Sequence, residues 1–225
     1  MSSNNYFYDQ DENKLQKEYI ENELKKNDGS IEEKLLENGI KCFQKTENGK
    51  LKVCLYFKND LLHSPGDTPA VIKYYDSGRR AEEKWFQNGK LHREKKDDVA
   101  FPTWIRYYEN GHIQDEYWHR NDELHHDNGL AHISYFEDGR KREQRWFQNG
   151  KYERKASLFE TILPSAIKFY NNGNVQEEIW YKNGVTFRES CDGIELPAHN
   201  QYYENGKIKT RMWYVDGNIK RIEYF

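Results

Sequence analysis

Aromatic and β-branched residues alternate with charged residues in short runs over most of the chain, and the runs end at glycine or asparagine. An alternation with a period of two predicts half-buried β-strands. Asn-Gly between two such runs predicts a tight hairpin turn, since a type I′ turn needs positive φ at both central residues. We place such turns at Asn205-Gly206 and, in the twice-occurring word WFQNGK, at Asn88-Gly89 and Asn149-Gly150. The pattern therefore predicts repeated β-hairpins.

The repeat is marked by glycines that follow an aromatic pair and precede a tryptophan by seven residues. These glycines are Gly78, Gly111, Gly139, Gly173 and Gly206, and the tryptophans are Trp85, Trp118, Trp146, Trp180 and Trp213. A second turn glycine follows in four units, and Asp122 replaces it in the second unit. A degenerate unit surrounds Gly49. Residues 41–225 are therefore predicted to form about five and a half stacked hairpin units.

The proposed register can be examined in the sequence itself. With the first turn at each marker glycine, the residue five positions before it faces the residue four positions after it. The facing pairs are Lys73 with Glu82, Arg106 with Asp115, Ser134 with Glu143, and Lys168 with Glu177. Three of these pairs have opposite charges, which stabilises a ladder. We expect the face that carries these pairs to be mostly solvated, and the isoleucines, first aromatics and tryptophans to form an apolar face.

The first 40 residues follow a different pattern. Residues 12–26 place apolar side chains on one helical stripe, at Leu15, Tyr19, Ile20 and Leu24. Ser30 and Glu33 form a capping box, and Gly39 stands at the predicted helix end. These helices either cover the open edge of the first hairpin or bind a partner. The expected fold is thus all-β, an elongated antiparallel repeat sheet (41–225) with a short N-terminal α-helical cap (1–40).

Composition narrows the class of protein. Hydrophobic residues are 36% of the chain, which is low for a globular domain, but aromatics reach 15%, which is high for a disordered one. The net charge of −3 gives no basic field for nucleic acid. Three cysteines without metal-type spacing favour a reducing compartment, and we find no signal peptide or long apolar run. We therefore expect a cytoplasmic protein that does not bind nucleic acid, with membrane association disfavoured.

The pattern P-A-x-I-x-Y-Y-x-x-G, followed by E-x-W-x-x-N-G-K-L-H-R, resembles membrane occupation and recognition nexus (MORN) repeats. The likeness is to the longer-spaced variety of bacterial antitoxin-component proteins and of paralogous sets in giant DNA viruses. Pro69-Ala70 and Leu91-His92-Arg93 carry it, and the later units depart from it at Tyr152-Glu153-Arg154 and Phe187-Arg188. The resemblance covers about four-fifths of the chain. The resemblance implies a module for protein interaction or membrane association. If the protein is viral, the resemblance implies that it is located in the host cytoplasm or in the virion.

Chemistry-bearing residues do not gather into a recognisable catalytic or metal motif. Five histidines fall within residues 112–132, but most of them occupy ordinary repeat positions without the paired spacing of zinc ligands. Adjacent glutamates such as Glu82-Glu83 point to opposite faces of a strand. We find no nucleophile elbow, phosphate loop or dinucleotide fingerprint. The sequence therefore predicts no enzyme, no cofactor and no metal site.

We expect a protein-interaction scaffold or adaptor with a protein partner. The second unit is unusual because Trp104 adds a ring to the otherwise charged face, and the predicted partner-binding residues are Trp104, Tyr108, Tyr117 and His119. The alternative for Trp104 is packing against a neighbouring strand or beneath the connection after His126. Two other functions stay open, which are an antitoxin or immunity-type binder of a specific toxin, and an enzyme with its site on the concave sheet face.

Overall fold

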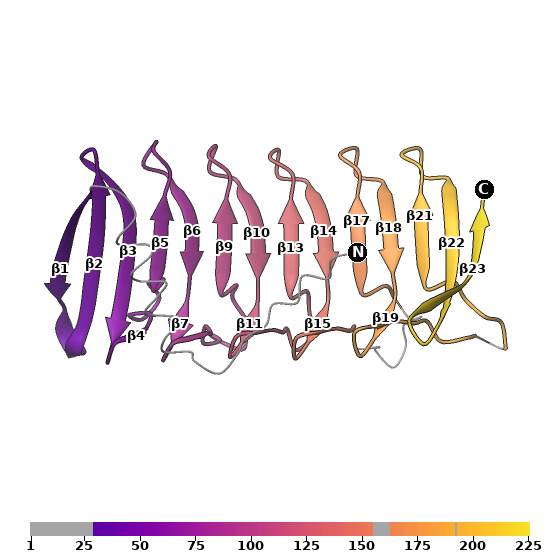
Figure 1. Ribbon diagram of the computed structural model, residues 1–225, viewed down its shortest axis with the longest axis horizontal. Helices are drawn as coiled ribbons and strands as arrows, with labels where there is room; N and C mark the ends of the chain where they lie inside the picture. Colours follow the sequence, from indigo (N-terminus) through magenta and orange to yellow (C-terminus); the bar gives the residue numbers. More distant parts are fainter. Residues whose placement is uncertain (1–28, 155–162, 192) are drawn as a thin grey trace. The chain divides into compact units, whose positions relative to one another are not determined.

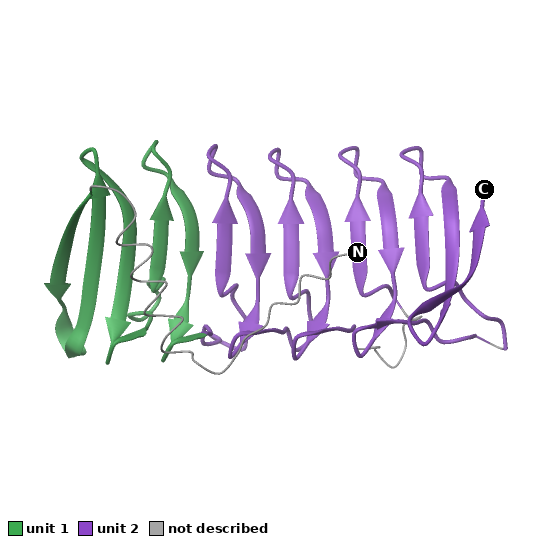
Figure 2. Ribbon diagram, viewed as in Figure 1, with its two compact units in different colours: residues 1–90 green, residues 91–225 purple. Residues whose placement is uncertain are grey.

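The structure is a computed structural model that describes residues 29–154, 163–191 and 193–225. The chain divides into two compact units, residues 1–90 and 91–225 (Figure 2). In the described residues both units consist of antiparallel strands without an α-helix, and the only helical element is a 3-10 turn at Glu37–Gly39. The predicted class of an all-β protein with repeated antiparallel hairpins is confirmed.

The first unit contains an antiparallel sheet in the order β1-β2-β3-β5-β6 (Figure 1). Its strands are β1 (Ser30–Leu35), β2 (Ile40–Glu47), β3 (Lys50–Lys58), β5 (Val71–Tyr74) and β6 (Arg80–Lys84), with β4 (Leu61–Leu62) paired to β3. Val53, Leu55 and Phe57 of β3 form its core together with Leu62, Ala70 and Val71. A small hairpin of β7 (Phe86–Gln87) and β8 (Lys90–Leu91) follows along the chain.

The second unit contains a row of four hairpins and a last strand, in the order β9-β10-β13-β14-β17-β18-β21-β22-β23 (Figure 1). The first four strands are β9 (Trp104–Tyr107), β10 (Ile113–Tyr117), β13 (His132–Tyr135) and β14 (Lys141–Arg145). They are followed by β17 (Ala166–Phe169), β18 (Val175–Ile179), β21 (His199–Tyr202), β22 (Ile208–Val215) and β23 (Asn218–Tyr224). The four predicted facing pairs are Cα partners, so the predicted register is confirmed.

Each hairpin of the second unit except the last is followed along the chain by a small hairpin, in which each strand has two residues. These are β11 (His119–Arg120) with β12 (Glu123–Leu124), β15 (Phe147–Gln148) with β16 (Lys151–Tyr152), and β19 (Tyr181–Lys182) with β20 (Val185–Thr186). Consecutive small hairpins are joined by a backbone hydrogen bond, because Gly150 donates to Leu124 at 2.9 Å and Gly184 donates to Tyr152 at 3.0 Å. The second turn of each repeat therefore links the repeat to the one before it.

Asp122, the exception at this second turn, makes the same link and adds to it. Its N–H donates to the Leu91 carbonyl at 3.2 Å, and its carboxylate accepts from the Leu91 N–H at 2.7 Å. Its φ of 72° lies in the left-handed region, which aspartate tolerates better than most residues. The replacement of glycine thus gains a side-chain hydrogen bond.

The two turns of each repeat differ, and one predicted turn type is wrong. Asn88-Gly89 and Asn149-Gly150 have positive φ at both residues, as type I′ turns require. At Asn205-Gly206 only Gly206 has positive φ, 80°, and its N–H donates to the Tyr203 carbonyl at 2.9 Å. This is a type I turn followed by a left-handed glycine.

The register was nevertheless correct, because a bulge compensates for the longer turn. Tyr202 pairs with Ile208, whereas a type I′ turn would pair it with Lys209. Lys209 is then passed over in a β-bulge, and Gln201 pairs with Thr210. The same shift occurs next to the first turn in the other hairpins.

The predicted N-terminal helical cap is contradicted where the structure describes it. Ser30–Leu35 form β1, which pairs with β2 through Ile31 with Lys45 and Glu33 with Phe43. Pairing along six residues satisfies backbone groups that a helix would satisfy internally, so tertiary context overrides the capping signal. The predicted helix at 12–26 lies outside the described residues. The division into residues 1–40 and 41–225 stays a prediction.

Candidate functional site

Alternation assigns the residues of the second unit's sheet to two faces, and one face carries two parallel rows of side chains. The ring row consists of Trp104, Tyr117, His132 and Arg145, which are Cα partners strand by strand, with Tyr152 and Tyr181 beside them. The charge row consists of Arg106, Asp115, Ser134, Glu143, Lys168 and Glu177, which are also successive partners. We call this face the row face. It carries the three predicted pairs that belong to the second unit, which are Arg106 with Asp115, Ser134 with Glu143, and Lys168 with Glu177.

The ring row contains two groups of stacked side chains. Trp104 stacks on Tyr117 with centroids 4.6 Å apart, and Tyr117 stacks on His132 at 4.4 Å with an interplanar angle of 13°. The Arg145 guanidinium lies 5.9 Å from the Tyr152 ring, which stacks on Tyr181 at 4.6 Å. Offset stacking and cation–π contact favour such an arrangement of rings. Antiparallel pairing places Trp104, Tyr117 and His132 opposite each other, whereas Tyr152 and Tyr181 come from two neighbouring small hairpins.

In the charge row, the carboxylates lie deep and the cations lie outside. The side chains of Asp115, Glu143 and Glu177 are 5%, 12% and 14% exposed, whereas those of Arg106 and Lys168 are 45% and 43% exposed. Asp115 is held by Arg106 at 3.5 Å and by His132 at 3.2 Å. The expectation of a mostly solvated face was therefore wrong for the acids, because long basic side chains and rings cover them.

Three of the four predicted partner-binding residues lie together. Trp104 and Tyr117 are half-buried neighbours, and His119 lies 6.2 Å from Tyr117 with its Nδ1 2.6 Å from the Thr103 hydroxyl. Tyr108 is separated from them, at the turn end of its hairpin, where its hydroxyl donates to the Tyr135 carbonyl at 2.8 Å. Their role in binding a partner stays a prediction.

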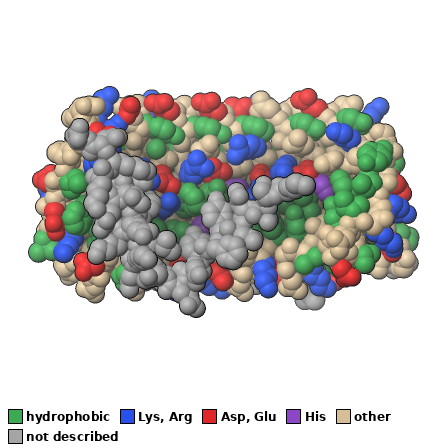
Figure 3. Space-filling model, viewed as in Figure 1, with side chains coloured by type: hydrophobic (Ala, Val, Ile, Leu, Met, Phe, Trp, Pro, Cys, Tyr) green, Lys and Arg blue, Asp and Glu red, His purple; other side chains and the backbone are tan. Residues whose placement is uncertain are grey.

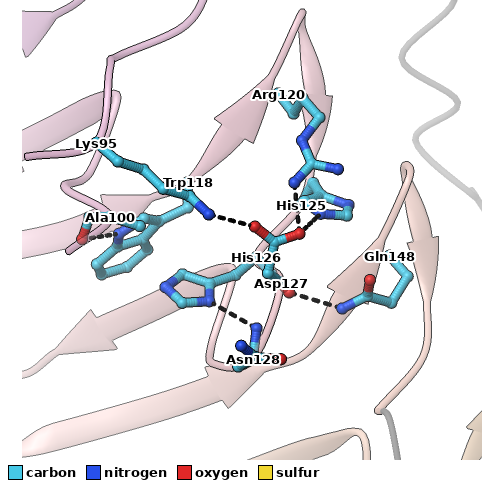
Figure 4. Close-up of polar contacts among 9 residues, drawn as sticks. All are labelled: Lys95, Ala100, Trp118, Arg120, His125, His126, Asp127, Asn128 and Gln148. Carbon is cyan, nitrogen blue, oxygen red and sulfur yellow. Dashed lines mark hydrogen bonds and ion pairs between the residues drawn. The ribbon is translucent and has the colours of Figure 1, made fainter. Parts of the chain in front are cut away.

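A second polar cluster lies around Asp127, next to the small hairpin β11–β12 (Figure 4). Its carboxylate accepts from Lys95, Arg120 and the Nε2–H of His125, and these hydrogen bonds hold its pKa far below the ordinary value. The buried His125 also accepts from the Asn149 N–H at 3.1 Å through Nδ1. The cluster thus fixes a connection between repeats, and its acid is already occupied by three donors.

The tyrosines of the ring row are not poised for acid–base chemistry near neutral pH. Burial raises the pKa of Tyr117 and of Tyr181 to about 12. Among the described residues, no group of three or more His, Cys, Asp and Glu side chains is placed to hold a metal ion. In the same part of the chain, no helix is long and apolar enough to cross a membrane. The row face therefore presents ring edges and exposed basic side chains to an approaching molecule.

Sequence reasoning missed the residues that the inter-hairpin pairing adds to the row face. His132 and Arg145 face each other in one hairpin, but their alignment with Tyr117 depends on the pairing between β10 and β13. The marker glycines predict which residues face each other within a hairpin, but they do not predict which residues face each other between neighbouring hairpins. The available signal was the common register of the hairpins, because hairpins of equal register that pair side by side bring equivalent positions opposite each other.

Comparison of the sequence with models of known protein families found no matching family, and comparison with curated proteins found no matching relative.

Proposed function

We propose that the protein is a non-enzymatic interaction scaffold of MORN type, and that it binds a protein partner in the cytoplasm through the row face of residues 91–225. The observation that carries this proposal is the stack of the half-buried Trp104 and Tyr117 on the buried His132. Stacked rings form a stiff surface, so little side-chain entropy is lost when a partner covers their edges. Tryptophan, tyrosine and arginine are also the residues that contribute most to binding energy at protein interfaces.

The form of the fold also favours binding over catalysis. A repeat sheet contacts mainly its neighbours in sequence, so it presents an extended surface to a partner. The acids of the row face are neutralised by close cations, and its tyrosines keep their protons. A general base or nucleophile would need a shifted pKa in the opposite direction.

The test is affinity capture of the tagged full chain from extract of its source organism, with bound proteins identified by mass spectrometry. We expect a protein that is enriched over an unrelated bait and that binds the purified chain directly. A broad hydrolase and transferase screen is run on the same sample. Turnover that is abolished by changing one polar residue of the row face would contradict the proposal.

A further inference from the structure

The exposed charges of the row face are of one sign. Five basic side chains lie on this face, at Arg106, Arg142, Arg145, Lys168 and Lys209, against three acidic ones at Asp115, Glu143 and Glu177. The acids are nearly buried, as described above. The Arg142 side chain is 45% exposed, and Lys209 is exposed with its ammonium 5.8 Å from the Tyr203 ring. A molecule approaching this face therefore meets cations first.

A hollow lies at the far end of the charge row. It has a volume of about 240 Å³ and is lined by Lys168, Tyr170, Gln176, Glu177, Gln201, Tyr202 and Lys209. Glu177 already accepts from His199 at 2.7 Å and from Lys168 at 2.9 Å, so its charge is compensated within the fold. The exposed Lys209 adds a second cation to the hollow. These groups suit an incoming carboxylate.

The two rows are two residues apart along each strand, which is roughly 7 Å. An extended polypeptide that crosses the strands over this face would direct alternate side chains to the two rows. Carboxylates on one side would meet Arg106, Arg142, Lys168 and Lys209. Apolar or aromatic side chains on the other side would meet the edges of the ring row.

In the space-filling view, acidic side chains gather along the rim of the hairpin turns, and basic side chains lie below that rim (Figure 3). The exposed turn residues include Glu109, Glu137, Asp138 and Glu204. This rim repels an acidic segment and confines it to the strands. Phosphates along a nucleic-acid strand would be repelled by the same rim.

We infer that the row face of residues 91–225 binds an extended acidic segment of its protein partner, in which carboxylate and apolar side chains alternate. This inference rests on the proposed function and specifies the chemistry of the partner. The carboxylates lie over Arg142 and in the hollow beside Lys209. The apolar side chains lie against Trp104 and Tyr117.

The test uses the full chain and a fluorescent peptide of about ten residues that alternates Glu and Leu and spans roughly 33 Å when extended. We expect saturable binding by fluorescence anisotropy that weakens as salt is raised from about 0.05 M to about 0.5 M. The double variant Arg142→Glu, Lys209→Glu should bind at least about tenfold more weakly, which corresponds to about 1.4 kcal/mol. The matched control Lys141→Glu, Lys151→Glu reverses two exposed lysines on other surfaces and should bind as the wild type does.

Absence of peptide binding, or equal binding by the double variant with an unchanged melting temperature, would overturn the inference. Equal binding of a Lys-Leu peptide or of a single-stranded oligonucleotide would do the same, as would self-association of the chain through these residues. A captured partner that binds the double variant fully would also overturn it while leaving the proposed function intact. If no partner is captured and the peptide does not bind, both proposals fail.

Discussion

Glu177, a nearly buried acid of the charge row, makes the stability of the fold depend on pH. The hydrogen bond from His199, together with the one from Lys168, holds the pKa of Glu177 at about 2, below its ordinary value of 4.5. A carboxyl whose pKa is lowered by folding stabilises the fold above pH 4.5, and this contribution is lost as the pH falls toward 2. Glu177→Gln should therefore unfold more easily than the wild type at pH 6.

The measurement is urea denaturation of both proteins at several pH values. The difference in unfolding free energy, on the order of 2 kcal/mol at pH 6, should shrink steadily between pH 4.5 and pH 2. Glu204→Gln, in an exposed turn, is the control and should leave the stability unchanged. A Glu177→Gln difference that stays constant with pH would show that the contribution of this residue is not electrostatic.

Gly206 tests the turn geometry at the same scale. Its φ is 80°, and a Cβ added there would meet nothing within 4 Å, so any cost of substitution comes from the backbone. Gly206→Val should lower the unfolding free energy by about 1–2 kcal/mol and the melting temperature by roughly 2–8 °C. Gly206→Asn should cost less, since asparagine tolerates this region. Equal melting temperatures for all three proteins would contradict the left-handed assignment.

At the residue scale, the sequence allowed the marker glycines and the paired charges to be predicted. It did not distinguish a type I′ turn from a type I turn with a left-handed glycine, because both accept Asn-Gly. The burial of Asp115 was not predictable from alternation alone. It depends on how Arg106, Arg142 and His132 fold over the carboxylate.

At the scale of elements, the small hairpins are joined to each other by a few specific hydrogen bonds. His125, with its side chain 5% exposed, connects Asp127 to the N–H of Asn149 in the next small hairpin. His125→Leu leaves that N–H without its acceptor, and we expect a loss of about 1–3 kcal/mol in urea denaturation.

The matched comparison is Arg120→Ala, which removes another donor to the same carboxylate. Its side chain is 45% exposed, so the loss should stay below about 1 kcal/mol. If Arg120→Ala destabilised the protein more than His125→Leu does, the exposed ion pair would be the main link. That result would contradict the role given to His125.

Prediction of the elements from sequence succeeded where hydrophobic alternation and turn residues agreed, as they do in the hairpins of residues 41–225. It failed at Ser30–Leu35, where the local signal was helical and the deciding interaction is pairing with β2. Pairing between hairpins was also outside the prediction. Of the ring row, the predicted partner-binding residues therefore include only Trp104 and Tyr117, and His119 lies next to Tyr117.

At the scale of the molecule, the rows arise because each hairpin of the second unit has the same register and antiparallel pairing between hairpins aligns their equivalent positions. A small buried residue lies directly before the first strand of each repeat. These residues are Ala70, Thr103, Ala131, Ser165 and Ala198. The backbone N–H of Trp118 donates to Ala131, and that of Trp180 donates to Ala198, at 2.9 Å each. Each repeat thus fixes its successor, and the two units of the chain each carry this arrangement.

The central claim is that the row face binds a protein partner, and Trp104 tests it most directly. Affinity capture is compared between the wild type, Trp104→Ala and Arg106→Ala, with Lys141→Ala as a control on the opposite face. We predict that Trp104→Ala and Arg106→Ala lose most of the captured partner, that the control retains it, and that all melting temperatures stay within a few degrees of the wild type. Full retention of the partner by both row-face variants, or its loss only together with a large drop in melting temperature, would contradict the claim.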